Sequence, residues 1–189
     1  NPSIFEKAIL ESHEYDQDIR AMTLQKAAVN TIYETLRQGD VQKAADVFRT
    51  VYEETGGWDG YVSLEVNPHL AYDTNGTLKE ARRLWAALNR PNVSIKVPAT
   101  TEGLPAIQQL IGEGINVNVT LLFGLPRYRQ VAEITLLHQC LGLGELGLGI
   151  DGDEIGFHHF GNKHCSLRVS LYQFEIIILS SYRAIILRI

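Results

Sequence analysis

The sequence predicts an α/β fold with parallel strands, belonging to a (β/α)8 barrel that this chain leaves incomplete. Strand-like and helix-like segments alternate three times between residues 61 and 134, a spacing that predicts parallel strands joined by right-handed crossovers. Each of these strands has one apolar and one polar face, whereas a doubly wound sheet is apolar on both faces. A barrel accommodates polar groups on its inner face near the carboxyl-terminal rim. An open sheet with a polar active-site edge is the alternative.

Helices are predicted before the first strand. Residues 17–37 place apolar side chains at helical spacing, and Gly39 predicts where this helix ends. Asp40 then has the residue type of an N-cap, and an apolar stripe follows it as far as Gly56. We therefore expect two amphipathic helices here, separated at Gly39.

After residue 60 the spacing of the apolar side chains along the sequence changes. Alternating side chains predict strands, and apolar residues three or four positions apart predict helices. The predicted strands are residues 61–66, 93–98 and 115–123, and the predicted helices are residues 77–88, 101–114 and 125–134. Thr77 and Glu80 have capping-box spacing at the start of the first of these helices. Pro126 suits the first turn of the last one.

Composition narrows the classes of function. The 189 residues carry a formal charge of −5 without a dense basic run, which argues against nucleic acid as a partner. Cys140 and Cys165 are too few for a disulfide framework, so a reducing, cytoplasmic setting is expected. The first ten residues lack a signal-peptide pattern, and the apolar stretch 174–189 contains two arginines and is shorter than the ~20 residues of a membrane helix. The chain does not begin with Met, and we expect it to belong to a longer gene product.

No metal site is predicted. Three histidines and a cysteine near the carboxyl terminus have no standard zinc-ligand spacing and no second ligand pair: His158, His159, His164 and Cys165. Arg127 and Arg129 open the last predicted helix, where a solvated helix surface is favoured over a contact with phosphate.

Four polar side chains lie late on the polar faces of adjacent strands: Glu65, Lys96, Asn118 and Thr120. A partly dry ammonium there is expected to have a lowered pKa, and a neutral amine attacks carbonyls to form a Schiff base. Glu65 would move protons through a water that Thr120 holds, and Asn118 would bond a substrate hydroxyl or carbonyl. The alternative is a structural ion pair of Lys96 with Glu65, although such pairs stabilise poorly when buried.

Four segments resemble the transaldolase family, collinearly from Asn1 to about Val131: NPSIFEKAI (1–9), SLEVNP (63–68), NVSIKVPAT (92–100) and GINVNVTLLFG (114–124). The resemblance implies a (β/α)8 barrel with neither metal nor organic cofactor. It implies that a dihydroxyacetone unit passes from sedoheptulose 7-phosphate or fructose 6-phosphate to glyceraldehyde 3-phosphate or erythrose 4-phosphate. These sugar phosphates would be its small-molecule partners in the cytoplasmic pentose phosphate pathway.

Roles carried over by position follow from the same resemblance. Lys96 matches the Schiff-base residue, and Glu65 and Thr120 match the residues that bind and activate the catalytic water. Asn118 and Asn1 match asparagines that contact the substrate.

The sequence also departs from the family. The family's first-strand aspartate would lie before Asn1, and its phosphate-binding serine and arginines lie on later strands. Residues 135–189 do not show the pattern of barrel strands, so we divide the chain into a partial barrel (1–134) and an unassigned, atypical tail such as a shifted reading frame would produce. Two alternatives stay open: a class I sugar-phosphate aldolase, and an inactive barrel remnant that binds a partner and is poorly soluble alone. Acceptor preference and oligomeric state are not predicted.

Overall fold

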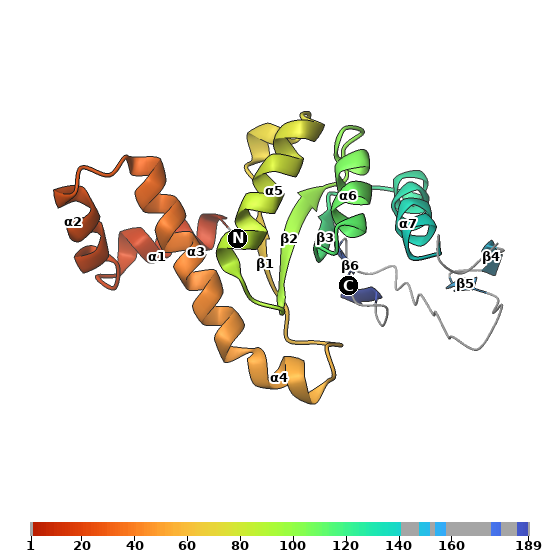
Figure 1. Cartoon of the computed structure of the whole chain (residues 1–189), viewed down its shortest axis with the longest axis horizontal. Coiled ribbons are helices and arrows are strands. Elements are labelled where there is room, and N and C mark those ends of the chain that lie inside the picture. Colours follow the sequence, from red (N-terminus) through yellow and green to blue (C-terminus); the bar gives the residue numbers. More distant parts are fainter. Residues whose placement is uncertain (1, 141–147, 152–153, 158–174, 179–184, 189) are drawn as a thin grey trace.

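Three parallel strands form the centre of the protein. A computed structural model describes residues 2–140, 148–151, 154–157, 175–178 and 185–188, with side chains over residues 6–134. The strands lie side by side in the order β1 (Val62–Glu65), β2 (Val93–Pro98), β3 (Val117–Thr120) (Figure 1). Both pairings are parallel, which confirms the predicted strand–helix alternation.

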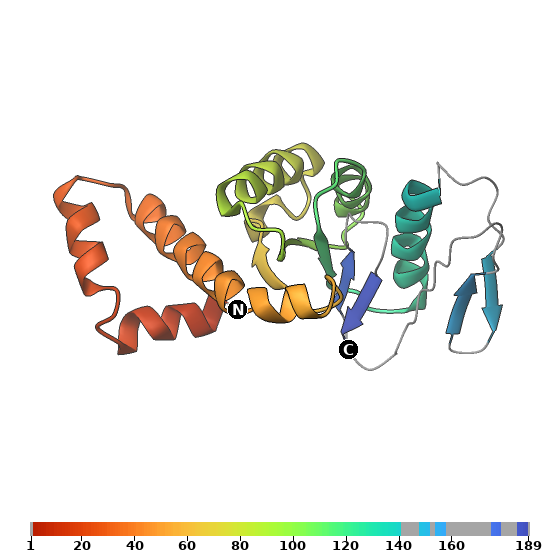
Figure 2. The same ribbon diagram turned by 60° about the horizontal axis from the view of Figure 1, so that its bottom comes forward.

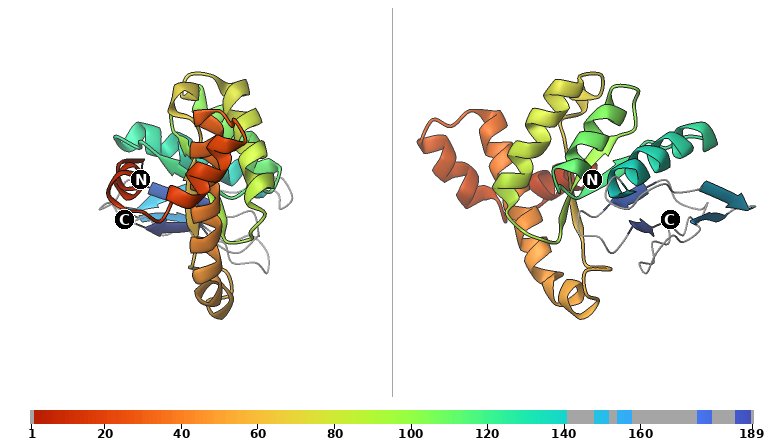
Figure 3. Two further views of the ribbon diagram at one scale, coloured as in Figure 1. Left: turned by 90° about the vertical axis from the view of Figure 1, so that its left-hand side faces the viewer. Right: turned by 45° about the vertical axis from the view of Figure 1, so that its right-hand side comes forward.

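Three helices pack along the apolar side of this sheet. They are α5 (Thr74–Leu88), α6 (Gly103–Gly112) and α7 (Leu125–Cys140), and a short 3-10 turn, η1 (Pro68–Leu70), precedes α5. Neighbouring helices contact each other, and α5 and α6 contact β2 (Figure 3). Alternate strand residues point into this layer and are fully buried with the facing helix residues: Val93, Ile95, Val97, Val117, Val119, Leu84, Leu88, Ile107 and Leu110. The polar strand positions therefore face the opposite side of the sheet.

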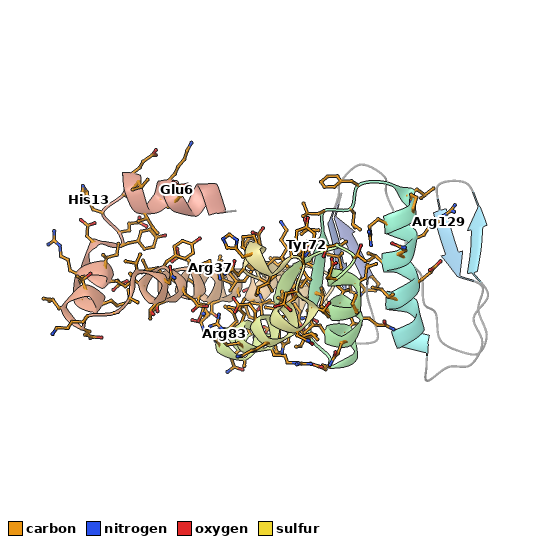
Figure 4. The ribbon with its side chains drawn as sticks, turned by 90° about the horizontal axis from the view of Figure 1, so that it is seen from above. Glu6, His13, Arg37, Tyr72, Arg83 and Arg129 are labelled. Atoms are coloured by element: carbon orange, nitrogen blue, oxygen red, sulfur yellow. The ribbon has the colours of Figure 1, made fainter. Side chains whose placement is uncertain are left out.

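Four helices precede the sheet: α1 (Pro2–Glu11), α2 (Asp16–Leu24), α3 (Val29–Val47) and α4 (Arg49–Glu54). The α2 helix lies away from the sheet, whereas α3 reaches back to contact β1 and α5 (Figure 2). Arg83 on α5, labelled in Figure 4, pairs with Glu34 on α3 and with Glu80 on its own helix. Helix α3 thus contacts β1 directly and is joined to α5 by an ion pair.

The predicted helix break at Gly39 is wrong. The α3 helix continues through Gly39 and Asp40, because Leu36 and Ala45 are buried on either side of the glycine and hold the helix in place. A single glycine costs a helix only about 1 kcal/mol relative to alanine, which such burial offsets. Asp40 caps nothing; its Oδ2 accepts a 2.5 Å hydrogen bond from the Tyr15 hydroxyl. The real break precedes Val29 and includes Lys26 with φ +58°.

The predicted capping box of α5 is also wrong. Helix α5 begins three residues earlier than expected, where the side chain of Asp73 accepts a 2.9 Å hydrogen bond from the backbone N–H of Gly76. Thr77 lies inside the helix, and its hydroxyl donates to the carbonyl of Leu70 at 2.9 Å. The prediction for Pro126 is confirmed, since it is the second residue of α7.

Short antiparallel pairs occur near the carboxyl terminus. Strands β4 (Leu148–Asp151) and β5 (Glu154–Phe157) pair with each other. Strand β6 (Glu175–Ile178) pairs antiparallel with β3 and with β7 (Ile185–Arg188). The described strands thus form an open five-stranded sheet and a separate two-stranded sheet, and barrel closure stays a prediction. The cluster His158, His159, His164 and Cys165 lies outside the described residues. Among the described helices, none is long and apolar enough to cross a bilayer.

Candidate active site

Lys96 and Glu65 occupy the polar side of the sheet as partners on adjacent strands. They are opposite each other in the parallel register of β1 and β2. The Lys96 Nζ lies 3.1 Å from Oε1 of Glu65, which is an ion-pair distance. The neighbouring residues Ile95 and Val97 point to the other side and are fully buried under the helices. Strand alternation therefore separates an apolar helix-covered face from a face that presents an amine beside a carboxylate.

Burial on the polar face decreases along β2 from Ser94 to Lys96, whereas Asn118 on β3 stays buried beside Lys96. Ser94 is fully buried and Asn118 is 3% exposed. The Lys96 side chain is 20% exposed and that of Glu65 is 36% exposed. The amine and the carboxylate thus stand where a buried polar layer opens, which is where parallel α/β folds bind ligands.

A chain of hydrogen bonds joins polar side chains next to the ion pair. The Ser63 and Ser94 hydroxyl oxygens are 2.8 Å apart, and the Asn118 Nδ2 donates to Ser63 Oγ at 2.9 Å. These residues come from β1, β2 and β3, so the bonds tie the polar positions of all three strands together. Asn118 is also opposite Lys96 in the register of β2 and β3.

Thr120 lies on the same face, further along β3. Its register partner is Pro98, which places it nearer the carboxyl ends of the strands than Asn118, and it is half-buried. The next residue, Leu121, has φ +61° and is 50% exposed. A branched residue in the left-handed region is strained, and such strain gathers at functional sites.

The loops after β1 and β2 are bonded to each other beside the site. The Thr100 hydroxyl donates to the carbonyl of Ala71 at 2.5 Å and accepts from the N–H of Gly103 at 2.9 Å. The Thr74 hydroxyl donates to the carbonyl of Glu102 at 2.7 Å. A Cβ on Gly103 would collide with the carbonyl oxygen of Pro98. The residues that follow Lys96 therefore build a rigid rim.

The family model described as transaldolase/fructose-6-phosphate aldolase matches residues 1–156. The chain belongs to this family. Curated relatives named transaldolase also match this chain. The chain is 48% identical over 136 residues to that of Saccharopolyspora erythraea, covering 72% of this chain and 37% of the relative. It is 51% identical over 136 residues to that of Thermobifida fusca, with the same coverage. Against Trichodesmium erythraeum it is 52% identical over 132 residues, 70% of this chain and 35% of the relative.

This transaldolase-family chain spans little more than a third of the length of the curated relatives it matches. The matches confirm the resemblance drawn from the four segments. The family model extends past Val131 to residue 156, whereas the relatives align over 132 to 136 residues.

The structure describes four of the five residues predicted for the candidate site. Lys96 and Glu65 are in contact, and Asn118 and Thr120 share their face of the sheet. Asn1 lies outside the described residues.

Arg129 is on α7, beside the sheet and not above it (Figure 4), and its helix neighbour Arg127 approaches the Thr101 hydroxyl at 3.4 Å.

Sequence reasoning missed the two serines. Ser63 and Ser94 bond to each other on the polar face of the sheet. The signal that identifies them is their place two residues before Glu65 and Lys96, because residues i and i+2 of a strand share a face.

Proposed function

We propose that the protein acts as a transaldolase through a Schiff base on Lys96. The observation that supports this most is the 3.1 Å approach of the Lys96 amine to Glu65 at the open end of a buried polar layer. Family membership supports it independently. A purely structural ion pair would explain the contact but not its place at the carboxyl ends of parallel strands, where barrel enzymes keep catalytic groups.

The proposed chemistry begins when the Lys96 ammonium gives up a proton and becomes a neutral amine. Its proton has an acceptor within reach, because Glu65 Oε1 is 3.1 Å away. The amine nitrogen bonds to the ketose carbonyl carbon, and the former carbonyl oxygen leaves as water as the imine forms. The imine withdraws electrons when the bond between the α and β carbons breaks. The β-hydroxyl loses its proton to the acid/base group and becomes the aldehyde of the released aldose phosphate, and a three-carbon enamine stays on Lys96.

The other polar residues have supporting roles in this proposal. Glu65 and Thr120 hold the water that exchanges protons with the intermediate and later hydrolyses it. Asn118, with Asn1, bonds substrate oxygens. The acid/base group for carbon–carbon cleavage is the aspartate that the family resemblance places before Asn1.

The proposal extends to the whole protein. We propose a complete (β/α)8 barrel and sugar phosphates as donor and acceptor: sedoheptulose 7-phosphate or fructose 6-phosphate, with glyceraldehyde 3-phosphate or erythrose 4-phosphate. A cytoplasmic role in the pentose phosphate pathway follows from these substrates. The polar layer supports this, because hydroxyl-rich substrates need several fixed hydrogen-bonding groups around the reacting carbon.

An aldolase is the second candidate, because the family description names fructose-6-phosphate aldolase beside transaldolase. The two reactions share the Schiff base and differ in the acceptor. Release of free dihydroxyacetone without an aldose phosphate would assign the aldolase, whereas product that forms only with the acceptor would assign the transferase.

Borohydride reduction tests the shared step. The 189-residue chain is incubated with fructose 6-phosphate and reduced with borohydride, and its mass is then measured by mass spectrometry. We expect a covalent sugar adduct that is lost in Lys96→Ala and kept in Lys79→Ala, a matched change at an exposed lysine of α5. An adduct that survives in Lys96→Ala would overturn the mechanism, and a chain that forms none would support the inactive remnant.

A further inference from the structure

Ser94 is fully buried on the central strand, two residues before Lys96. A buried hydroxyl is costly unless it forms a hydrogen bond, and the Ser94 Oγ lies 2.8 Å from that of Ser63. Both side chains stand on the polar face, where an alanine would fill nearly the same space. The buried Ser94 hydroxyl therefore serves its hydrogen bond to the half-buried Ser63, which packing alone does not require.

Ser63 is also hydrogen-bonded to a residue of the third strand, β3. Ser63 accepts a 2.9 Å hydrogen bond from Nδ2 of Asn118. The terminal amide of asparagine rotates in a broad, nearly two-fold well, and its two orientations have almost the same shape but exchange donor and acceptor. The backbone hydrogen bonds of the strands do not fix either orientation of the amide. The bond to Ser63 fixes the orientation when the Ser63 hydroxyl donates its own hydrogen to Ser94 Oγ, because Ser63 can then only accept and only the NH₂ side of the amide donates.

The three residues form one path from β2 through β1 to β3. Ser94 restricts the Ser63 hydroxyl, and Ser63 restricts the Asn118 amide. Ser94 itself is buried beneath Lys96 and Glu65, so it is placed to act through the other two residues without being a catalytic residue.

We propose that Ser94 is a positioning residue that fixes, through Ser63, which side of the Asn118 amide meets the substrate. This inference rests on the proposed function in one respect, namely that Asn118 contacts the substrate. The hydrogen-bond path itself does not depend on that function, so each part has its own readout.

The first readout is the side-chain NH₂ resonances of Asn118 in ¹⁵N-labelled chain, assigned by their loss in Asn118→Ala. We expect Ser94→Ala to shift or broaden them. Ser94→Cys, which keeps a weak donor, should restore these resonances in part. Ser12→Ala, at the serine directly after α1, should leave them unchanged. Resonances that are unmoved in a folded Ser94→Ala chain would overturn the positioning role.

The second readout is borohydride trapping at varied fructose 6-phosphate concentration. We expect Ser94→Ala to raise the half-saturating concentration by about 2- to 10-fold, the usual effect of one neutral hydrogen bond, with less than about two-fold change in the maximal rate. In an Asn118→Ala background the same change should have no further effect. An equal loss in both backgrounds would show that Ser94 acts on stability alone. If wild type forms no adduct while the resonances respond as expected, the proposed function fails and the positioning path stands.

Discussion

The amine of Lys96 and the carboxylate of Glu65 meet at 3.1 Å across two adjacent parallel strands. Their backbones are register partners, so the pairing follows from the sheet itself and not from a flexible loop. Sites built on strands hold their geometry more closely than sites on loops. The pair is supported from below by buried hydroxyl and amide groups and opens toward the carboxyl ends of the strands.

Removing the carboxylate charge should impair proton transfer without unfolding the sheet. We expect Glu65→Gln to slow borohydride trapping about 100-fold, because a positioned general base contributes about 10²- to 10⁴-fold. The measurement is the trapping rate at saturating fructose 6-phosphate. Glu54→Gln, at an exposed position in α4, is the matched control. An undiminished rate in Glu65→Gln would show that the contact with Lys96 is structural.

Asn92 connects three parts of the fold. Its fully buried side chain donates from Nδ2 to the carbonyls of Ala45 at 2.7 Å and Gly60 at 2.9 Å. Asn92→Ala leaves both carbonyls without this donor, so we expect the free energy of unfolding to fall by about 2–3 kcal/mol. Urea denaturation measures it. The exposed Asn75→Ala should stay within about 0.5 kcal/mol of wild type, and equal effects at the two positions would contradict the assignment.

Alanine substitutions at two glycines should change the stability of the chain in opposite directions. At Gly103 a Cβ would strike the carbonyl oxygen of Pro98, whereas at Gly39 it would meet nothing within 4 Å. Gly103→Ala should therefore destabilise the chain by about 1–3 kcal/mol. Gly39→Ala should stabilise it by up to about 1 kcal/mol, since Gly39 lies inside α3. Thermal unfolding compares them, and a destabilising Gly39→Ala would show that α3 does not continue through this position.

These outcomes show what the sequence could and could not predict. Alternation along the strands placed Glu65 and Lys96 on one face, because strand geometry alone decides that. The helix boundaries at Gly39 and Thr77 were wrong because burial of Leu36 and Ala45, and the cap at Asp73, outweighed local residue preferences. The bonds among Ser63, Ser94 and Asn118 were not predicted, since they depend on how three strands are aligned in space. Nor does any local pattern predict the antiparallel β6 beside β3.

The hydrogen bond from Tyr15 to Asp40 predicts a pH effect. That bond, together with desolvation and the nearby carboxylates of Asp40 and Glu14, raises the pKa of Tyr15 to about 12. Tyr15 therefore keeps its proton more strongly in the folded chain than in the unfolded chain. Its contribution to stability is present below the unfolded pKa of about 10 and is lost as the pH rises toward 12.

Tyrosine ionisation followed at 295 nm tests this assignment by comparison of variants. Tyr15→Phe removes one high-pH transition from the wild-type curve and so identifies it. In Asp40→Asn the same transition should move down toward pH 10, because the charged acceptor is gone. Asp46→Asn, which changes a carboxylate that pairs with Arg90 instead, should leave it in place. A Tyr15 transition unaffected by Asp40→Asn would contradict the hydrogen-bond assignment.

The most direct test of the Schiff-base account is the position of the trapped sugar. After fructose 6-phosphate and borohydride, the chain is digested and each lysine-containing peptide is sequenced by mass spectrometry. The account predicts a secondary amine on Lys96, with either the whole reduced ketose phosphate or its three-carbon fragment attached. An adduct spread over exposed lysines such as Lys43 and Lys79, with Lys96 unmodified, would contradict it.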